Sequence, residues 1–567
     1  MYPTQWQEAI VIPILKPAKD PKDPLSYRLI ALTSCLCKTL ERMVNARFVY
    51  QLEKHRCIPL FQSGFRKGRF TLDSIIMLEN KLQTAINNIV KWCDTNGHSI
   101  SASKSCCVPF CRKRGIHPDP EIRIRDVQIP VVPDVRFLGV IFDRRLTFLP
   151  HILQLRKRCE KSLNLLKELS NTSWGADRTS LLRVYQEIVL SRIDYGCVVY
   201  GSACNSTLRK LDPVHHFALR ISGAFHTSPV QSLYVHCNQL LLDIRRRKLC
   251  LAYYFKILSV PSHPLQNVYM SSSMKRLFDA RPSNIRLFMD RMKLLVSELN
   301  LPNVNIQQGN VLQLQPWNTP RFHYINPFAS YSKSTVAPVV FQRVFAYHHS
   351  QYRNFSPIFT DGSKRADYVG CGVVIEDITH GCRLDTSCSV FTAEAVTICH
   401  ALQLIDSNMP RKYCIYTDSM SVLEALENYT DRCHPVVCNI LYITGRLYYK
   451  GFDIVFCWLP SHVGIIGSEQ ADSAARSATT YLPLALPHSD MKHVILHHIL
   501  TTWQELWSQQ LDNKLHSVKP AIGAWPVIPM RGTDVKLTRL RNGYTRFTHR
   551  HLLFGENAPE CTSCKVS

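Results

Sequence analysis

The stretch Phe359-Thr-Asp361-Gly-Ser363 decides the fold of its part of the chain. A short β-forming run ends there in an acidic residue and a glycine that turns into the next strand. The run Tyr413-Cys-Ile-Tyr-Thr-Asp418-Ser419 repeats this pattern further along the chain. A turn aspartate is the ordinary explanation of either acid alone. Taken together, two strands that end in Thr-Asp predict two carboxylates at neighbouring strand tips.

The residues around these runs predict a sheet with helices between its strands. The spacing of apolar residues predicts five strands, over 356–361, 368–375, 382–390, 413–418 and 452–458. A helix is expected after the third strand, with Thr392 as its N-cap, and another over Met420–Glu427. The last helix has a close-packing face of small residues, made of Ala471, Ala474, Ala475 and Ala478. The expected order is β-β-β-α-β-α-β-α.

Two further acids and a histidine fall within this pattern. Glu394 lies in the first turn of a helix, Asp472 lies in the last helix, and His462 lies in the loop before it. A helix dipole also favours a first-turn glutamate, and a lone loop histidine is usually a surface residue. Four carboxylates brought together repel one another unless divalent cations hold them ionised. Oxygen ligands suit Mg²⁺ or Mn²⁺, and two ions can clamp the water and the leaving oxygen of a phosphodiester.

These motifs resemble those of type 1 ribonuclease H across residues 355–480. The matching runs are Thr360-Asp-Gly-Ser363, Ala393-Glu394, Thr417-Asp-Ser419 and Trp458-x-x-x-His462 with Glu469-x-Ala-Asp472. The resemblance implies a ribonuclease H-like α/β domain with a five-stranded mixed sheet. It also implies cleavage of the RNA strand of RNA–DNA hybrids, which the enzyme would tell from DNA by the 2′-hydroxyls.

The resemblance assigns roles to individual residues. The two metal ions would be held by Asp361, Glu394, Asp418 and Asp472, with Asp361 bridging them. His462 would assist proton transfer or product departure. Contacts to the nucleic acid would come from Gly362, Ser363 and Ser419. The family often has asparagine where this chain has Ser468, and the segment shows no basic protrusion. Substrate grip would then fall to Lys364, Arg365 or other domains.

The charge of the chain predicts a nucleic-acid partner. The 567 residues are enough for about three to five domains. The formal net charge is +25, which favours a polyanion. Residues 355–480 hold 9 basic and 14 acidic residues, a net charge of −5, which leaves +30 for the remainder. We therefore expect the basic parts to hold backbone phosphates and the acidic part to hold catalytic cations.

No membrane segment or leader is predicted. The chain has no apolar run of about 18 residues, and its amino terminus has no signal-peptide core. We expect a soluble, intracellular protein without a membrane partner. The 22 cysteines are then expected to be reduced thiols that serve as small apolar residues. Neither the oligomeric state nor a choice between nucleus and cytoplasm follows from the sequence.

Residues 1–80 carry three spaced motifs, Lys16-Pro17, Tyr27-Arg-Leu-Ile30 and Gly64-Phe-Arg66-Lys-Gly68. They are compatible with an ordinary α/β lobe that has exposed basic loops. In combination they resemble the fingers of reverse transcriptases from non-LTR retrotransposons, with Leu29 in place of the family's proline and Phe70 in place of its serine. By that resemblance Lys16, Arg28 and Arg66 would contact template or triphosphate.

Residues 81–150 resemble a truncated palm of the same family. A polymerase palm needs aspartates that converge on two metal ions, and the chain contains no Asp-Asp pair. Only 40 residues separate Gly64 from Lys104, too few for the missing strands and helix. The catalytic middle is thus deleted, or lost in the gene model. We expect an incomplete fingers, palm and thumb remnant without reverse transcriptase activity.

The remaining segments are predicted from apolar spacing and punctuation. Residues 151–260 read as basic helices, which fit a plain helical bundle or, by resemblance, a thumb that grips duplex backbone. The run Arg245–Lys248 reads as a basic helix face or a nuclear localisation patch. Residues 261–352 read as a connecting linker with some helix over 286–299.

Residues 481–567 predict a helical tail with half a zinc motif. A Trp-rich helix is expected over 502–511, and Tyr544 replaces the usual histidine of a retrotransposon-like run. A closed structural zinc site needs four ligands, whereas only Cys561 and Cys564 are present, with His549 or His551 as remote alternatives. We expect no zinc site.

Three functions are left to compare: an active ribonuclease H in a defective retrotransposon-derived protein, an idle nucleic-acid-binding relic, and a working reverse transcriptase. The missing palm aspartates count against the third. The first two share all their sequence features, so only an assay separates them.

Overall fold

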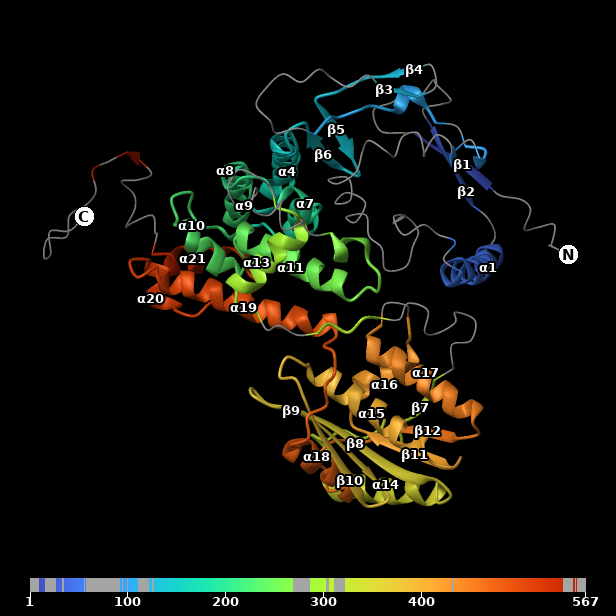
Figure 1. Ribbon diagram of the computed structural model, residues 1–567. Helices are drawn as coiled ribbons and strands as arrows, with labels where there is room; N and C mark the ends of the chain where they lie inside the picture. Colours follow the sequence, from blue (N-terminus) through green and yellow to red (C-terminus); the bar gives the residue numbers. More distant parts are fainter. Residues whose placement is uncertain are drawn as a thin grey trace, which may run out of the picture. The chain divides into compact units, whose positions relative to one another are not determined.

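The structure is a computed structural model of the 567-residue chain. It describes residues 10–15, 27–32, 35–55, 57, 92–93, 95–98, 100–110, 122–124, 127–268, 286–301, 305–309, 322–430, 433–543, 554–555 and 557. The chain divides into two compact units, one of Met1–Gln62 with Gln307–Pro487 and one of Ser63–Ile306 with His488–Ser567. We call residues 307–487 the sheet unit, and residues 127–306 with 488–543 the helical unit (Figure 1).

The sheet unit is built on one mixed sheet of six strands. They are β7 (Tyr324–Ile325), β8 (Ser356–Lys364), β9 (Val369–Ile375), β10 (Ile378–Leu384), β11 (Lys412–Thr417) and β12 (Asp453–Trp458). Their order is β10-β9-β8-β11-β12-β7, antiparallel up to β8 and parallel from there on. The predicted sheet of five strands is therefore one strand short, because β7 pairs with the outer edge of β12.

The third strand starts earlier than the predicted span of 382–390. Glu376 and Asp377 join β9 to β10 as a two-residue turn, since Ile375 pairs directly with Ile378. Both turn residues have positive φ, 49° and 66°, which matches the right-handed twist of the two strands. Two-residue turns of this kind usually contain Asn-Gly or Asp-Gly, so the Glu-Asp pair did not predict one here.

Three helices cover one face of the sheet: α15 (Val390–Asp406), α16 (Met420–Glu427) and α17 (Pro435–Tyr449) (Figure 1). The N-cap of α15 is Ser389, whose side chain accepts from Thr392 N–H at 3.2 Å, so the predicted cap at Thr392 is wrong by one turn. Thr392 itself is buried inside the helix. Helix α17 was not predicted, and it packs against α15.

Helix α18 (Ile466–Ser477) covers the opposite face. In β9, Cys371 points to the α15 face, where its Sγ lies 3.4 Å from Ala393 O. The neighbouring Gly370 and Gly372 point the other way, and a Cβ on either would overlap a carbonyl oxygen of α18. The helix can approach this closely because Ala471 and Ala475 are small and fully buried, as the alanine pattern predicted.

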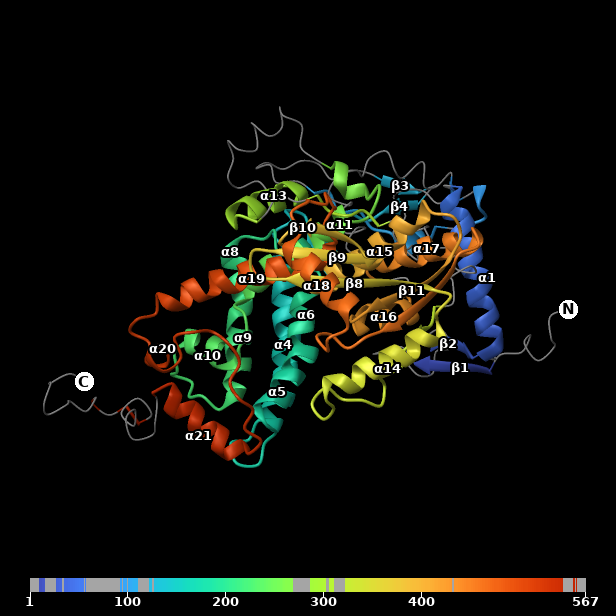
Figure 2. The same ribbon diagram turned by 90° about the horizontal axis from the view of Figure 1, so that it is seen from below.

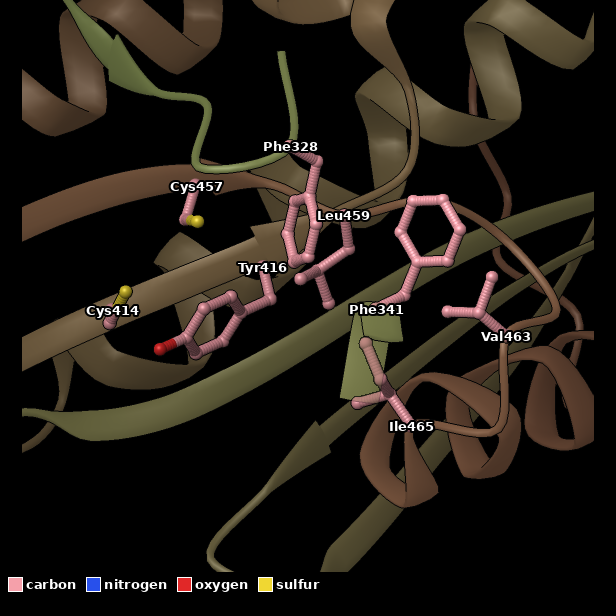
Figure 3. Close-up of a cluster of buried hydrophobic side chains, with 8 residues drawn as sticks. All are labelled: Phe328, Phe341, Cys414, Tyr416, Cys457, Leu459, Val463 and Ile465. Atoms are coloured by element: carbon pink, nitrogen blue, oxygen red, sulfur yellow. The ribbon is translucent and has the colours of Figure 1, made fainter. Parts of the chain in front are cut away.

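Helix α14 (Pro338–Gln351) also lies on this face of the sheet (Figures 1 and 2). It belongs to a buried cluster of eight side chains (Figure 3): Phe328, Phe341, Cys414, Tyr416, Cys457, Leu459, Val463 and Ile465. Residues 322–351 were predicted as part of a linker. They are instead part of the core of the sheet unit, because their aromatic residues cover β11 and β12.

The helical unit consists mainly of helices, from 4 to 21 residues long. They are α4 (Leu149–Leu169), α5 (Arg178–Tyr185), α6 (Ser191–Asp194), α7 (Cys197–Tyr200), α8 (Asn205–Leu208), α9 (Asp212–Leu219), α10 (Val230–Cys237), α11 (Leu242–Leu258), α13 (Phe288–Glu298), α19 (His488–Ser508), α20 (Lys514–Val518) and α21 (Arg531–Arg541). The tail helix α19 packs along α11. Helices α19, α20 and α21 follow the sheet unit in the sequence but belong to the helical unit.

The smaller elements form hairpins and single turns. The hairpins are β1–β2 (Ile10–Leu15, Tyr27–Leu32), β3–β4 (Ile122–Ile124, Val127–Ile129) and β5–β6 (Asp134–Phe137, Val140–Asp143). Helix α1 spans Cys35–Lys54. The single turns are η3 (Ala102–Lys104), η4 (Gln186–Leu190), η5 (Arg209–Leu211), η6 (Arg220–Ser222) and η7 (Pro264–Asn267). Across the described residues, no helix is long and apolar enough to cross a membrane.

The run Arg245–Lys248 is not the solvated basic face that the sequence suggested. Arg245 binds Asp194 with both ends of its guanidinium, at 2.8 Å from Nε and 2.6 Å from Nη2. Arg246 is buried. Most of the cysteines that the structure describes are buried, as expected of small apolar residues.

Candidate active site

The sheet register brings two of the predicted acids together. Strands β8 and β11 are parallel neighbours, and Thr360 pairs with Thr417. Asp361 and Asp418 follow these two threonines, so their carboxylates leave adjacent strands at the same level. Trp458, at the end of β12, fixes this edge, because its indole N–H donates to the backbone oxygen of Asp418 at 3.0 Å.

Glu394 reaches the same place from α15. The helix can approach β8 because Gly362 has no side chain: a Cβ there would lie 2.6 Å from the backbone nitrogen of Glu394. Carboxylate oxygens of Asp361, Glu394 and Asp418 lie within 4.8 Å of one another. Glu394 is only 7% exposed, as expected for an acid on the packed side of its helix.

Asp472 joins this group from α18. Its carboxylate accepts from Arg476 Nε at 2.8 Å and is near enough to Asp361 to help raise the pKa of that acid. His462 Nδ1 lies 3.8 Å from Asp472 Oδ2 and 4.0 Å from Glu469 Oε2. The structure therefore brings together all five residues predicted as catalytic: Asp361, Glu394, Asp418, His462 and Asp472.

Glu469 is a site residue that the sequence interpretation did not assign. It lies one turn before Asp472 on α18, and with His462 these residues form a second group able to hold a cation. Its other oxygen accepts from Gly464 N–H at 3.3 Å, within the loop that carries His462. The spacing of three residues between Glu469 and Asp472 was the available signal, since it places both on one helix face.

Burial and like charge raise the pKa values of the central carboxyls. Burial, then the charges of Asp418 and Asp472, raise the pKa of Asp361 to about 7. The pKa of Glu394 is raised well above its usual range by burial and by the two aspartates. Burial also raises the pKa of Asp418, whereas the nearby His462 and Lys333 lower it. The site therefore disfavours the negative charge that its carboxylates carry in water.

The donor set fits a divalent cation. Glu394 Oε2 and Asp418 Oδ1 are buried and have no hydrogen-bond partner. An ionised oxygen in that state is costly unless a cation neutralises it. Carboxylate oxygens are hard ligands of the kind that Mg²⁺ and Mn²⁺ prefer. Among the described residues, only this group and that of His462, Glu469 and Asp472 combine three or more such ligand atoms.

The other predicted contact residues are placed unevenly. Gly362, Ser363 and Ser419 lie at the ends of β8 and β11, next to the central acids, and Ser419 is buried. Lys364 is engaged elsewhere, since its amino group donates to the backbone oxygen of Thr386 at 3.2 Å.

Several predicted features lie outside the part of the chain that the structure describes. Arg28 lies in β2 opposite Ile14, but its side chain is not described. Lys16, Arg66, the palm gap near residue 80 and the cysteines Cys561 and Cys564 lie outside the described residues.

Comparison with known proteins identifies the sheet unit. Residues 354–480 match the family model "RNase H". The chain is 27% identical to human ribonuclease H1 over 170 residues, which cover 26% of this chain and 58% of that protein. The predicted ribonuclease H resemblance and its mixed sheet with helices are confirmed. The five-residue site assignment stays a prediction.

Other relatives are RNA-directed DNA polymerases of LINE-type retrotransposons. The chain is 28% identical to the probable RNA-directed DNA polymerase from transposon X-element of Drosophila melanogaster over 346 residues, 39% of this chain and 38% of that protein. It is 45% identical to that of mobile element jockey from Drosophila funebris over 79 residues, 14% and 9% of the two chains. The chain thus spans well under half the length of these polymerases.

Proposed function

Because residues 354–480 form a ribonuclease H domain in a chain related to retrotransposon polymerases, we propose that this protein cleaves the RNA strand of RNA–DNA hybrids with divalent cations. One observation carries the proposal. Carboxylates from two strands and one helix converge, and two of their oxygens are buried without a hydrogen-bond partner within the protein. Such a group of carboxylates destabilises the fold unless a cation neutralises it, so its presence favours a metal site.

The ions, Mg²⁺ or Mn²⁺, would be held by Asp361, Glu394, Asp418 and Asp472. When bound, two ions supply a nucleophilic water and stabilise the leaving 3′-oxygen. Within the chain, Arg476 orients Asp472, and Trp458 holds the backbone at Asp418. Because the pKa of Asp361 is about 7, a proton must leave this site before a cation is held, so affinity for the cation rises with pH.

We propose that His462 moves protons at the edge of the site. Its side chain is 61% exposed, and its Nδ1 faces Asp472 and Glu469. An exposed imidazole next to carboxylates can accept a proton from one side and release it to water. Gly362, Ser363 and Ser419 are proposed to contact the nucleic acid, and the 2′-hydroxyls would mark the strand to be cut.

We also propose that the protein lacks polymerase activity, although its relatives are named as RNA-directed DNA polymerases. The chain has no Asp-Asp pair to hold the metal ions of a polymerase palm. The fingers, palm and thumb assignments for residues 1–260, with contacts from Lys16, Arg28 and Arg66, stay predictions. The competing function is an idle relic that binds nucleic acid, which the engagement of Lys364 favours because it removes one expected substrate contact.

A cleavage assay tests the proposal. The full chain is incubated with Mg²⁺ or Mn²⁺ and an RNA–DNA hybrid labelled on the RNA, beside matched DNA–DNA and RNA–RNA duplexes. We expect cleavage of the hybrid alone, abolished by a chelator and lost in Asp418→Asn, which removes a proposed metal ligand. Equal residual cleavage by wild type and Asp418→Asn would identify the idle relic. DNA synthesis in a primer-extension assay would refute the absence of polymerase activity.

A further inference from the structure

The sheet unit contains a segment that lies before the matched ribonuclease H domain and contacts the active-site loop. This segment, residues 322–351, is called the brace; it comprises β7, the following loop and α14. The loop it contacts, Ser461–Gly464, carries His462 between β12 and α18. The domain match begins only at residue 354, so the brace is not part of it.

Apolar contacts fix the brace to both ends of that loop. Phe328 and Phe341 are 1% and 2% exposed, and they share one cluster with Leu459, Val463 and Ile465 (Figure 3). The ring of Phe328 also packs edge-on against Trp458, with 6.1 Å between centroids. Because Trp458 donates a hydrogen bond to the backbone oxygen of Asp418, the contact between Phe328 and Trp458 also links the brace to this aspartate.

Two hydrogen bonds from the brace hold the backbone on either side of His462. Lys333 Nζ donates to Ser461 Oγ at 2.7 Å and to the Ser461 backbone oxygen, one residue before His462. Gln342 Nε2 donates to the Val463 backbone oxygen at 2.9 Å, one residue after it. His462 lies between these anchors in the left-handed region, with φ of 52°.

A left-handed histidine is strained and needs support from its surroundings. Non-glycine residues adopt this conformation rarely, and it persists where neighbouring structure holds it. The imidazole is mostly exposed, so its own packing does not supply that support. The chain outside the brace offers Glu469, which accepts from Gly464 N–H. The hydrogen bonds from Lys333 and Gln342 add support at Ser461 and Val463.

We propose that the brace positions His462 against Asp472, with Gln342 and Lys333 as positioning residues, so that the catalytic unit begins near residue 322. The inference rests on the proposed ribonuclease function. It extends that function to a segment with no counterpart in the matched domain. Fixing a proton-transferring group in place raises the rate of the chemical step more than it raises the affinity for substrate.

A double-mutant cycle in the full chain tests this role. Gln342→Ala and Lys333→Ala should each lower kcat on an RNA–DNA hybrid about 10-fold, with little change in KM. Lys333→Arg, which keeps a donor, should restore most of the rate. In a His462→Ala background, Gln342→Ala should cause no further loss. Lys450→Ala serves as the matched control, because its amino group pairs with Asp406 at the carboxy-terminal end of α15.

Three outcomes would count against the inference. Equal loss of rate from Gln342→Ala in the presence and absence of His462 would show that the brace acts only through stability. Unchanged kcat in both brace variants would also overturn it. The same variants are examined by hydrogen exchange, where the peptide over 459–466 should exchange faster while β9 and β10 do not; unchanged exchange there overturns the inference even if the wild type cleaves no hybrid. Absence of wild-type cleavage overturns the proposed function instead.

Discussion

The two units of this protein bury charged side chains in opposite electrostatic surroundings. In the helical unit, buried charges lie beside opposite charge or hydrogen-bond acceptors: Arg531 donates to the backbone oxygens of Ser170 and Ile221, and Arg178 Nη2 lies 3.7 Å from Asp534 Oδ1, although the Asp534 oxygens accept no hydrogen bond. In the sheet unit, the carboxylates of Asp361, Glu394 and Asp418 converge, and burial and like charge raise their pKa values.

Matched buried charges serve as connectors. Arg531 and Asp534 belong to the carboxy-terminal helix α21, whereas their partners come from residues before the sheet unit in sequence. Unmatched buried charges weaken a fold and persist where chemistry needs them. The comparison therefore predicts opposite responses to the removal of a charge from each unit.

The largest effect is expected from Arg531→Met in the helical unit. The substitution removes three donated hydrogen bonds and leaves Asp534, which is fully buried, with less positive charge nearby. Breaking a buried charged network of this kind costs about 3–5 kcal/mol. Chemical denaturation followed by hydrogen exchange in α4 and α21 measures the loss. The matched control is Arg156→Met, an exposed pair with Glu160 worth about 0.3–0.5 kcal/mol. Equal effects of the two substitutions would contradict the connecting role.

The next effect is the pH dependence of the metal-free sheet unit. The pKa of Asp361 is about 7 in the folded state against 3.8 for the ordinary group, so the folded state binds more protons between these values. Its contribution to stability is complete below pH of about 4 and is lost as the pH rises to about 7, by up to about 4 kcal/mol. The protection factors of β8 amides in chelator, which divide out the intrinsic rise of exchange with pH, should therefore fall over this window. Mg²⁺ should restore the protection at pH 7, and protection factors that do not change with pH would disprove the unmatched charge.

A smaller gain in stability is expected from Asp418→Asn in the metal-free state. The amide removes one of the converging charges and keeps the shape of the side chain, so repulsion falls. The unfolding free energy should rise by about 0.5–2 kcal/mol at pH 7, while cleavage is lost. The control Asp453→Asn lies in the same sheet, where it breaks an exposed pair with Lys412 at 3.4 Å. A destabilised Asp418→Asn would place this aspartate among the structural charges instead.

Sequence reasoning predicted the positions of the candidate-site residues better than the segments around them, for a physical reason. The acids stand next to strand ends and helix starts, and local patterns of period two and 3.6 fix those elements. Asp361 and Asp418 followed from two Thr-Asp runs, and Glu394 from the helix that Ser389 caps. Glu469 escaped because a second acid on an exposed helix face looks like ordinary surface.

The parts that were missed depend on contacts between distant residues. The sequence of the brace predicted a linker, because the packing role of Phe328 and Phe341 depends on their contact with β11 and β12. Helix α17 begins at His434-Pro435, with a capping histidine that few patterns include. The helical unit is completed by residues that follow the sheet unit, a pairing that no local period can reveal. Arg245 likewise reads as basic surface until Asp194 is placed beside it.

The smallest predicted effect concerns a carboxylate that behaves in the opposite way to Asp361. Asp177 caps α5 in the helical unit, where it accepts from Thr179 N–H at 2.9 Å and Ser180 N–H at 3.0 Å. The hydrogen bond from the Ser180 hydroxyl, with these backbone donors, lowers its pKa below 3.8. Its contribution is therefore present above pH of about 4 and lost as the pH falls through the lowered pKa. Asp177→Ala should cost about 1 kcal/mol at pH 7 and progressively less in acid, measured by denaturation of the full chain with exchange read at α5. If its pH dependence ran in the same direction as that of Asp361, the division between matched and unmatched carboxylates would fail.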